Sequence, residues 1–291
     1  MSIQNVAVLG AGIMGRGIAY VSALGGYPTA LQDTSREQLE RATNDISAML
    51  EKGVATGKVA DADALDARKR LRAHTSLEDA VRQADLVIEA VPERMDLKLE
   101  IFAQADRAAP AHAILASNTS SLSITEMAAA TRRAPQVVGL HFFNPVHRMK
   151  LLEVVRALET SERTLAACEE VVRRMGKECV TVRESPGFVT SRINAMIGNE
   201  AFYMLQEGVA SATDIDKALK LGLNHPMGPF ELVDLVGLDT RLSVLRFLHR
   251  TLGEKFRPCP LIEQYVAAGR LGRKSGRGVY EYAPVESTVA S

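Results

Sequence analysis

The stretch that decides the fold is Val6-Ala-Val-Leu-Gly10-Ala-Gly12-Ile-Met-Gly15. It runs from a short aliphatic, β-branched segment through three glycines into helix-forming residues. In such a strand–turn–helix pattern the first glycine permits a tight turn, the second lets a phosphate approach the backbone, and the third lets helix and strand pack closely. The helix N-terminus then offers N–H groups to an anion. The pattern predicts dinucleotide contacts from Gly10, Ala11, Gly12, Ile13, Met14 and Gly15.

An acidic residue supports this interpretation. Asp33 lies 18 positions after Gly15 and ends a second expected strand, Thr29–Gln32. A carboxylate at this position accepts hydrogen bonds from the ribose hydroxyls of an adenosine. The same charge would repel a 2′-phosphate at ~4 Å by roughly 1–4 kcal/mol. Asp33 therefore favours NAD over NADP, although Arg36, three residues later, offers a counter-charge.

Strand and helix patterns alternate over the first 184 residues. Further strands are expected at 85–91, 113–116, 137–142, 151–155 and 179–182, and helices at 94–109 and 162–175. Residues 35–52 and 61–72 are expected to form a helical hairpin inserted after the second strand. This alternation predicts a mostly parallel sheet covered by helices on both faces, as in a Rossmann domain.

The pattern changes after Ser185-Pro186-Gly187. Strand-like runs stop, and helical periodicity continues over 188–207, 212–220, 229–251 and 260–268. We expect Ser185 to cap the first of these helices and Pro186 to lie in its first turn. The sequence therefore predicts an α/β Rossmann domain over residues 1–184, followed by an all-α domain over residues 185–291.

Composition excludes several functional classes. Lys+Arg and Asp+Glu both number 35, so a net charge of zero gives no general attraction to nucleic acid or to an anionic membrane. The three cysteines form no CxxC pair and the histidines share no metal-ligand spacing, so we expect a reducing cytoplasmic compartment and no metal. The apolar stretch Val6–Gly26 holds six glycines and a central Arg16, so we expect neither a signal peptide nor a membrane segment.

A histidine and a glutamate carry the catalytic hypothesis. His141 opens the run His141-Phe-Phe-Asn-Pro145 at the end of one expected strand, and Glu153 follows 12 residues later on the next. A hairpin of this length can place the carboxylate beside the imidazole. A carboxylate bonded to one ring nitrogen fixes the tautomer and leaves the other nitrogen for proton transfer. Because a histidine in a strand is more often only a half-buried polar residue, the context decides.

Three separated motifs supply that context. They are Ser117-Asn-Thr-Ser-Ser-Leu122, the run at 141–145, and Leu219-Lys-Leu-Gly-Leu-Asn-His-Pro-Met-Gly-Pro-Phe230. Together they resemble the 3-hydroxyacyl-CoA dehydrogenases, above all the short-chain bacterial 3-hydroxybutyryl-CoA dehydrogenases. The likeness extends from Val6 to the run Leu271–Tyr280. It implies NAD-dependent oxidation of a (3S)-3-hydroxyacyl-CoA to the 3-ketoacyl-CoA, by a homodimer joined through its helical domain.

The resemblance also implies roles for individual residues. His141 matches the catalytic base, Glu153 the residue that orients it, and Ser120 a serine that touches both substrate and cofactor. Further matches at the cofactor are Glu93, Lys98, Asn144, which also borders the substrate, and Lys274. The hairpin at 35–72 matches the family's coenzyme A-binding arm, so its candidate phosphate contacts are Lys52 and Lys58.

One position departs from the family pattern. The family usually has Pro-Gly-Phe, two variable residues and then Asn-Arg, whereas this chain has Pro186-Gly-Phe-Val-Thr-Ser191-Arg192. Ser191 therefore stands where an asparagine that contacts the substrate is expected. Asn194 follows three residues later, on nearly the same face of a helix. We expect Ser191 to take the role, because the two positions match directly.

Two other functions remain open at this point. One is a related Rossmann dehydrogenase that acts on a polar hydroxy acid, such as gulonate or carnitine. The other is an NAD-binding structural protein similar to the lens crystallin relative of the family. The His141–Pro145 run argues against the first, and the presence of Ser120, His141 and Glu153 argues against the second.

Overall fold

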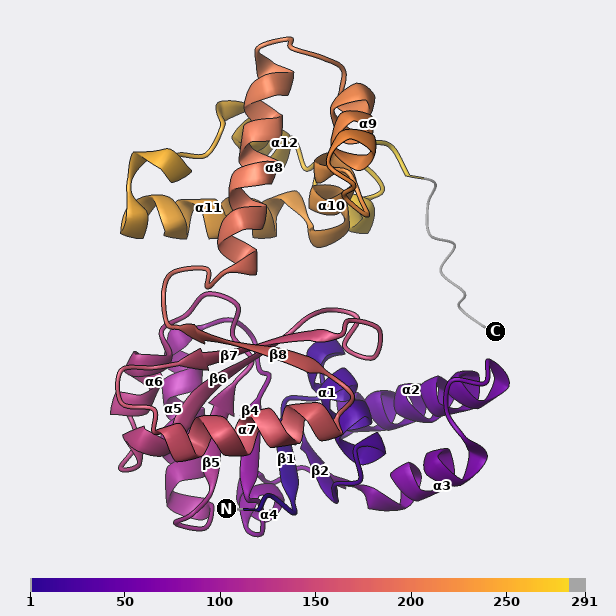
Figure 1. The fold of residues 1–291 in the computed structure, drawn as a ribbon, viewed down its shortest axis with the longest axis vertical. Helices are drawn as coiled ribbons and strands as arrows, with labels where there is room; N and C mark the ends of the chain where they lie inside the picture. The colour runs from indigo at the N-terminus through magenta and orange to yellow at the C-terminus, as the bar shows by residue number, and fades with distance from the viewer. Residues whose placement is uncertain (1, 283–291) are drawn as a thin grey trace. The chain divides into compact units, whose positions relative to one another are not determined.

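The computed structural model describes residues 2–282, and the chain divides between Ser185 and Pro186 into two units (Figure 1). The sequence pattern placed this boundary after residue 184. The first unit is built on one sheet, and the second consists of helices joined by short loops. Among the described helices, none is both long enough and apolar enough to cross a membrane.

The sheet of the first unit has the strand order β3-β2-β1-β4-β5-β6-β7-β8. Neighbouring strands are parallel except β6 and β7, which are antiparallel, so the predicted mostly parallel Rossmann sheet is confirmed. The strands are β1 Val6–Leu9, β2 Thr29–Gln32, β3 Leu71–His74, β4 Leu86–Glu89, β5 Ile114–Ser117, β6 Val137–Phe142, β7 Leu151–Arg156 and β8 Glu178–Arg183. Because β1 lies between β2 and β4, the strand order reverses beside it, and parallel sheets bind ligands at the carboxyl ends of strands next to such a point.

Helices cover both faces of this sheet. They are α1 Ile13–Leu24, α2 Arg36–Ala55, α3 Asp61–Arg70, α4 Leu77–Val81, α5 Met95–Ala108, α6 Ile124–Ala129 and α7 Glu162–Arg174. Helices α1, α2 and α7 share one buried cluster with the sheet, whereas α4, α5 and α6 pack on strands from the opposite face. The predicted hairpin is confirmed as α2 and α3, and Ser35 starts it by accepting the Gln38 N–H.

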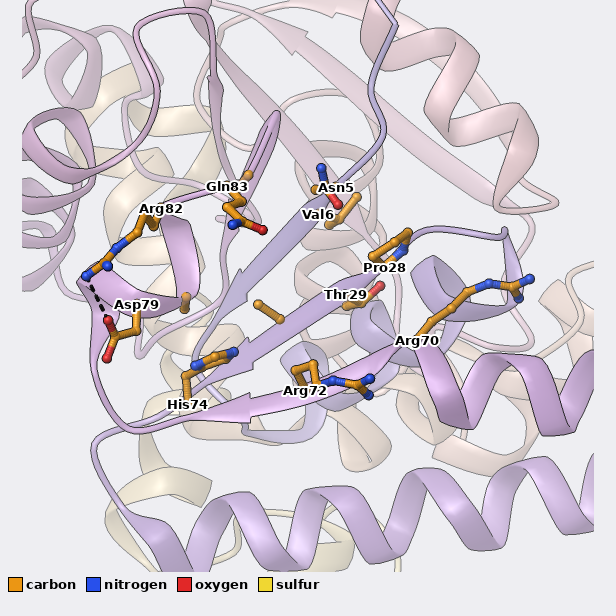
Figure 2. Close-up of a pocket in the computed structure, with 13 residues that line it drawn as sticks. Asn5, Val6, Pro28, Thr29, Arg70, Arg72, His74, Asp79, Arg82 and Gln83 are labelled. Carbon is orange, nitrogen blue, oxygen red and sulfur yellow. Dashed lines mark hydrogen bonds and ion pairs between the residues drawn. The ribbon is translucent and has the colours of Figure 1, made fainter.

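The edge strand β3 corrects one expectation. We expected a helix over 61–72, but α3 ends at Arg70 and Leu71–His74 pairs with β2. These four residues alternate apolar and polar side chains directly after a run of helix formers, so the change of period is too short to detect. Arg70, Arg72 and His74 line a pocket of about 470 Å³, which also borders the first residues of β1 and β2 (Figure 2).

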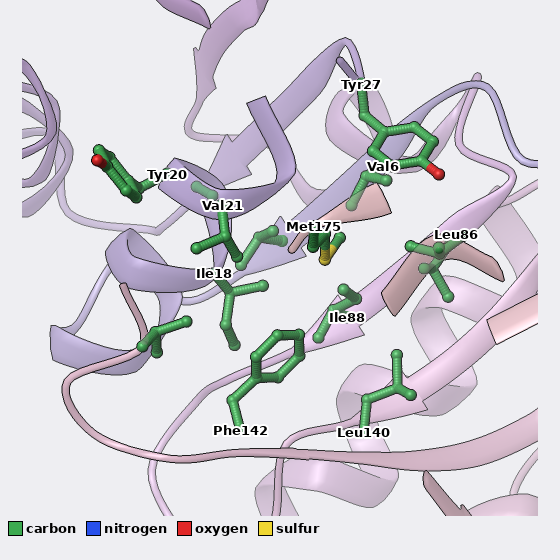
Figure 3. Close-up of a cluster of buried hydrophobic side chains, with 14 of the residues drawn as sticks. Val6, Ile18, Tyr20, Val21, Tyr27, Leu86, Ile88, Leu140, Phe142 and Met175 are labelled. Carbon is green, nitrogen blue, oxygen red and sulfur yellow. The ribbon is translucent and has the colours of Figure 1, made fainter. Parts of the chain in front are cut away.

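A buried cluster holds α1 against the sheet. Ile18 and Val21 of α1 contact the cluster formed by Val6, Ile88 and Leu140 of three different strands (Figure 3). Burying each such aliphatic side chain contributes roughly 1.5–3 kcal/mol. This packing fixes the N-terminus of α1 at the carboxyl end of β1, where the glycine-rich turn connects them.

The helical unit contains α8 Thr190–Gln206, α9 Ala212–Gly222, α10 Pro229–Val236, α11 Leu238–Leu252 and α12 Pro260–Ala267. Two expected boundaries are wrong. Gly187 has a φ of +74° and Phe188 a φ of +47°, so α8 begins at Thr190 and Ser185 does not cap it. The helix expected over 229–251 is two helices, because Gly237 has a φ of +105° and interrupts it.

Candidate active site

The glycine-rich turn follows β1 and has the geometry that a dinucleotide requires. Gly10 has a φ of +97°, which favours glycine, and a Cβ there would lie 2.8 Å from the Ala90 carbonyl oxygen. A Cβ on Gly15 would lie 1.7 Å from the Gly10 carbonyl oxygen. A Cβ on Gly12 would meet nothing within 4 Å, so there is space for a pyrophosphate. The turn therefore fits the predicted cofactor.

Asp33 supports this turn directly. Its Oδ2 accepts the Ala11 N–H at 2.9 Å, and its Oδ1 accepts the Ser35 N–H at 3.0 Å. Gln38 adds a contact that sequence reasoning missed, because its Nε2 donates to the Ala11 carbonyl at 2.9 Å. Each carboxylate oxygen accepts more than one hydrogen bond, so Asp33 retains capacity for ribose hydroxyls.

His141 and Glu153 are direct partners across the antiparallel strands β6 and β7. His141 Nδ1 lies 2.6 Å from Glu153 Oε2. The Glu153 side chain is fully buried and that of His141 is 8% exposed. A charge-assisted hydrogen bond in such a site is short and strong, and it fixes the orientation of the ring. The hairpin spacing thus places these two side chains together, as the sequence predicted.

The loop after β5 lies beside this histidine strand. Asn118 Oδ1 accepts the N–H of Phe142, the residue next to His141, at 3.0 Å. Ser120 donates its N–H to Glu93 Oε1 at 3.1 Å, and the Thr119 hydroxyl also bonds this oxygen. Sequence reasoning missed Asn118, although it lies inside the motif that contains Ser120.

Lys98 is held behind Glu93. Its side chain is only 1% exposed, and its Nζ lies 2.6 Å from Glu89 Oε1 and 3.4 Å from Glu93 Oε2. The cofactor contact predicted for Lys98 remains a prediction, but its contacts show that it holds Glu93. Glu89 was not singled out from the sequence, where a glutamate that ends a strand reads as an exposed residue.

A buried lysine shapes the loop between β6 and β7. Lys177 Nζ donates to the Val146 carbonyl and, at 2.7 Å, to the Met149 carbonyl. Val146 in turn packs on α1, where a Cβ on Gly17 would lie 2.9 Å from it. Asn144, on the same loop, is exposed. The loop that follows the catalytic strand is therefore tied to the helix that follows the glycine-rich turn.

Positive charge gathers around His147 on this loop. Burial lowers the pKa of His147, and the charges of Arg148, Lys177, Lys58 and Lys52 lower it further. The end of the α2–α3 hairpin thus lies close enough to act electrostatically on the loop. The two lysines predicted to contact coenzyme A are joined here by Arg148 and His147, which sequence reasoning did not connect with them.

Three predicted site residues lie in the helical unit. Ser191 is half-buried in the first turn of α8, and Asn194 is exposed one turn later. Lys274 bonds Asp239 Oδ2 at 2.7 Å within the same unit. The roles of these residues remain predictions. Across residues 2–282, no group of three or more His, Cys, Asp or Glu side chains is arranged to hold a metal ion.

Comparison with known families decides the identification. Residues 5–185 match the family described as 3-hydroxyacyl-CoA dehydrogenase, NAD binding domain, and residues 187–282 match its C-terminal domain. The chain belongs to the 3-hydroxyacyl-CoA dehydrogenase family. It is an NAD-dependent oxidoreductase that acts on a CH–OH group.

Similar proteins support this identification over the full length of the chain. A probable 3-hydroxybutyryl-CoA dehydrogenase of Bacillus subtilis is 47% identical over 283 residues, which cover 97% of this chain and 98% of the relative. The 3-hydroxybutyryl-CoA dehydrogenase of Bradyrhizobium diazoefficiens is 43% identical, with 96% of each chain covered. The crystal structure of (S)-3-hydroxybutyryl-CoA dehydrogenase from Ralstonia eutropha matches with a TM-score of 0.94 and 44% identity, covering 97% of this chain and all of that one. The resemblance inferred from the motifs is confirmed.

Proposed function

We propose that this dehydrogenase interconverts (3S)-3-hydroxyacyl-CoA and 3-ketoacyl-CoA, with 3-hydroxybutyryl-CoA as its characteristic substrate. The observation that carries the proposal is the buried hydrogen bond of 2.6 Å between His141 and Glu153. It lies on strands of the same sheet whose first strand leads into the glycine-rich turn. The names of similar proteins supply the substrate class, and one of them specifies the S configuration.

In this proposal the chain's residues manage one proton. NAD, held by the glycine-rich turn and Asp33, accepts the hydride from C3 of the substrate. His141 Nδ1 donates its hydrogen to Glu153, and Nε2 takes the proton of the substrate hydroxyl. The buried carboxylate stabilises the positive charge that develops on the imidazole. In the reverse direction, His141 returns this proton to the oxygen at C3.

Other residues position the substrate. The Ser120 hydroxyl, on the loop held by Glu93, donates a hydrogen bond to the substrate oxygen. Lys52, Lys58 and Arg148 supply charge-assisted contacts for the phosphates of coenzyme A, because their charges gather near one loop. This arrangement favours a coenzyme A ester over a small polar hydroxy acid, which carries no phosphate.

The test is reduction of acetoacetyl-CoA, followed by the loss of NADH absorbance. The proposal predicts turnover that decreases as the acyl chain of the 3-ketoacyl-CoA lengthens. His141→Asn should abolish turnover and retain NADH binding. A folded, NADH-binding chain that leaves acetoacetyl-CoA unchanged would refute the proposal. Turnover of gulonate or carnitine with NAD in its place would support the related dehydrogenases instead.

We also propose that the enzyme is a homodimer joined through its helical unit. Leu221 and Leu223, at the end of α9, are 77% and 67% exposed, and Leu235 of α10 is 50% exposed. Large apolar side chains gathered on one unit are typical of an interaction surface. A second copy of the chain with one two-fold axis would cover them.

A further inference from the structure

Glu89 is a buried carboxylate at the end of β4, and its side chain is 1% exposed. Its Oε1 accepts Lys98 Nζ at 2.6 Å and the Val91 N–H at 2.7 Å. Its Oε2 accepts the Ser117 hydroxyl at 2.6 Å. These three bonds come from three separate segments, so Glu89 joins the ends of β4 and β5 to α5.

Two routes lead from Glu89 to the loop that carries Ser120. Along the first, Lys98 Nζ lies 3.4 Å from Glu93 Oε2, and Glu93 Oε1 accepts the Ser120 N–H at 3.1 Å. Along the second, Ser117 Oγ accepts the N–H of Thr119 at 3.2 Å. The Thr119 hydroxyl bonds Glu93 as well, so the two routes meet on the same loop.

The charges of this group explain why its geometry is rigid. A buried ion pair adds little net stability, but removing one partner leaves an uncompensated charge. Lys98 neutralises Glu89, and its second carboxylate neighbour is the 40% exposed Glu93. If Glu89 lost its charge, Lys98 would be drawn towards Glu93. Glu93 would then exchange its bonds to Thr119 and Ser120 for a closer ion pair.

We propose that Glu89 is a positioning residue for the reaction. By fixing Lys98 and Ser117 it holds Glu93 and the Ser120 loop in the arrangement needed beside His141. The inference rests on the proposed function, because it assigns Ser120 to the substrate. It adds a residue that touches neither substrate nor cofactor and acts through the groups that do.

The test compares Glu89→Gln, Lys98→Met and the double variant in acetoacetyl-CoA reduction. Glu89→Gln should lower kcat by about 10²-fold, the effect of a misplacement of about 1 Å at a reacting centre. The NADH dissociation constant should change far less, because the glycine-rich turn and Asp33 are untouched. The chain has no tryptophan, so the fluorescence of bound NADH can be measured without that background.

The double variant separates positioning from a purely structural role. It removes both charges, so its Tm should recover towards the wild-type value. Its kcat should remain low, because Glu93 has lost Lys98. If kcat recovered together with Tm, the pair would be only structural and the inference would be overturned. Because this variant keeps no lone buried charge, the test stands even if Glu89→Gln does not fold.

A matched control lies at the other end of α5. Asp106 bonds Arg133 at 2.7 Å, and both side chains are less than 10% exposed. Asp106→Asn should lower Tm and leave kcat per folded enzyme unchanged. If wild-type enzyme fails to reduce acetoacetyl-CoA, the proposed function fails. If wild type is active and Glu89→Gln equals it, only the role of Glu89 fails.

Discussion

Replacing Glu153 with glutamine tests how this enzyme supports proton transfer, because the change removes a charge and keeps the shape. Glu153 is fully buried, and its Oε2 lies 2.6 Å from His141 Nδ1. A glutamine amide oxygen can accept the same hydrogen bond, so the imidazole ring keeps its orientation. The variant loses only the negative charge beside the imidazolium that forms during the reaction.

The size of the effect follows from the charge separation. Two unit charges about 4 Å apart interact by about 4 kcal/mol at an effective dielectric constant of ~20. Because each 1.36 kcal/mol in the barrier changes a rate tenfold, turnover should fall by about 10³-fold. This value lies within the ~10²–10⁴-fold range of general acid–base catalysis. NADH affinity should change little, since Glu153 makes no contact with the glycine-rich turn.

The assay measures kcat on acetoacetyl-CoA and, separately, the fluorescence of bound NADH. His141→Ala should be at least as damaging as Glu153→Gln. Glu178→Gln, at the exposed start of edge strand β8, provides a matched control that should keep full activity. A Glu153→Gln enzyme with unchanged kcat would refute the pairing. A variant that lost NADH binding to the same extent as kcat would instead indicate a general disturbance of the first unit.

Four further predictions follow from the proposed site. Asp33→Ala should lower the preference for NADH over NADPH by at least about fivefold, from a repulsion of ~1 kcal/mol or more, and a native preference for NADPH would contradict our interpretation. Ser191→Ala should cost roughly 1–3 kcal/mol in kcat/KM, whereas an effect confined to Asn194→Ala would move the contact along α8. The lowered pKa of His147 should rise when phosphate binds nearby, so coenzyme A should bind with proton uptake and more tightly as the pH falls, by an increment that His147→Gln removes. Light scattering at micromolar concentration should give a dimer, and a species of 31.5 kDa would count against it.

The features that the sequence predicted are those that depend on local geometry. The turn at Gly10–Gly15 requires glycine because of one positive φ and one contact of 1.7 Å, and both requirements act within a few residues. The pairing of His141 with Glu153 requires only a hairpin of known length, so counting residues was sufficient. These two features also carried the family resemblance, which the comparisons confirm.

The features that the sequence did not predict depend on distant contacts or on single backbone angles. Gly237 lies within an apolar, helix-like pattern, and only its φ of +105° shows that two helices meet there. The burial of Glu89 requires Lys98, nine residues later, and Ser117, 28 residues later. No period in the sequence links these three residues, because the sheet and α5 bring them together.

Burial of paired charges, and not the presence of a pocket, marks the reactive edge of this sheet. Glu89, Lys98 and Glu153 are at most 1% exposed, and each has a charged or ionisable partner at 2.6 Å. Around the pocket near the starts of β1 and β2, in contrast, Arg72 donates to backbone carbonyls and Arg82 pairs with a carboxylate while 71% exposed. Exposed pairs of that kind are worth little, whereas a buried charge imposes one geometry on its neighbours. Rigid placement of Ser120 and His141 is therefore available at one end of the strands and not at the other.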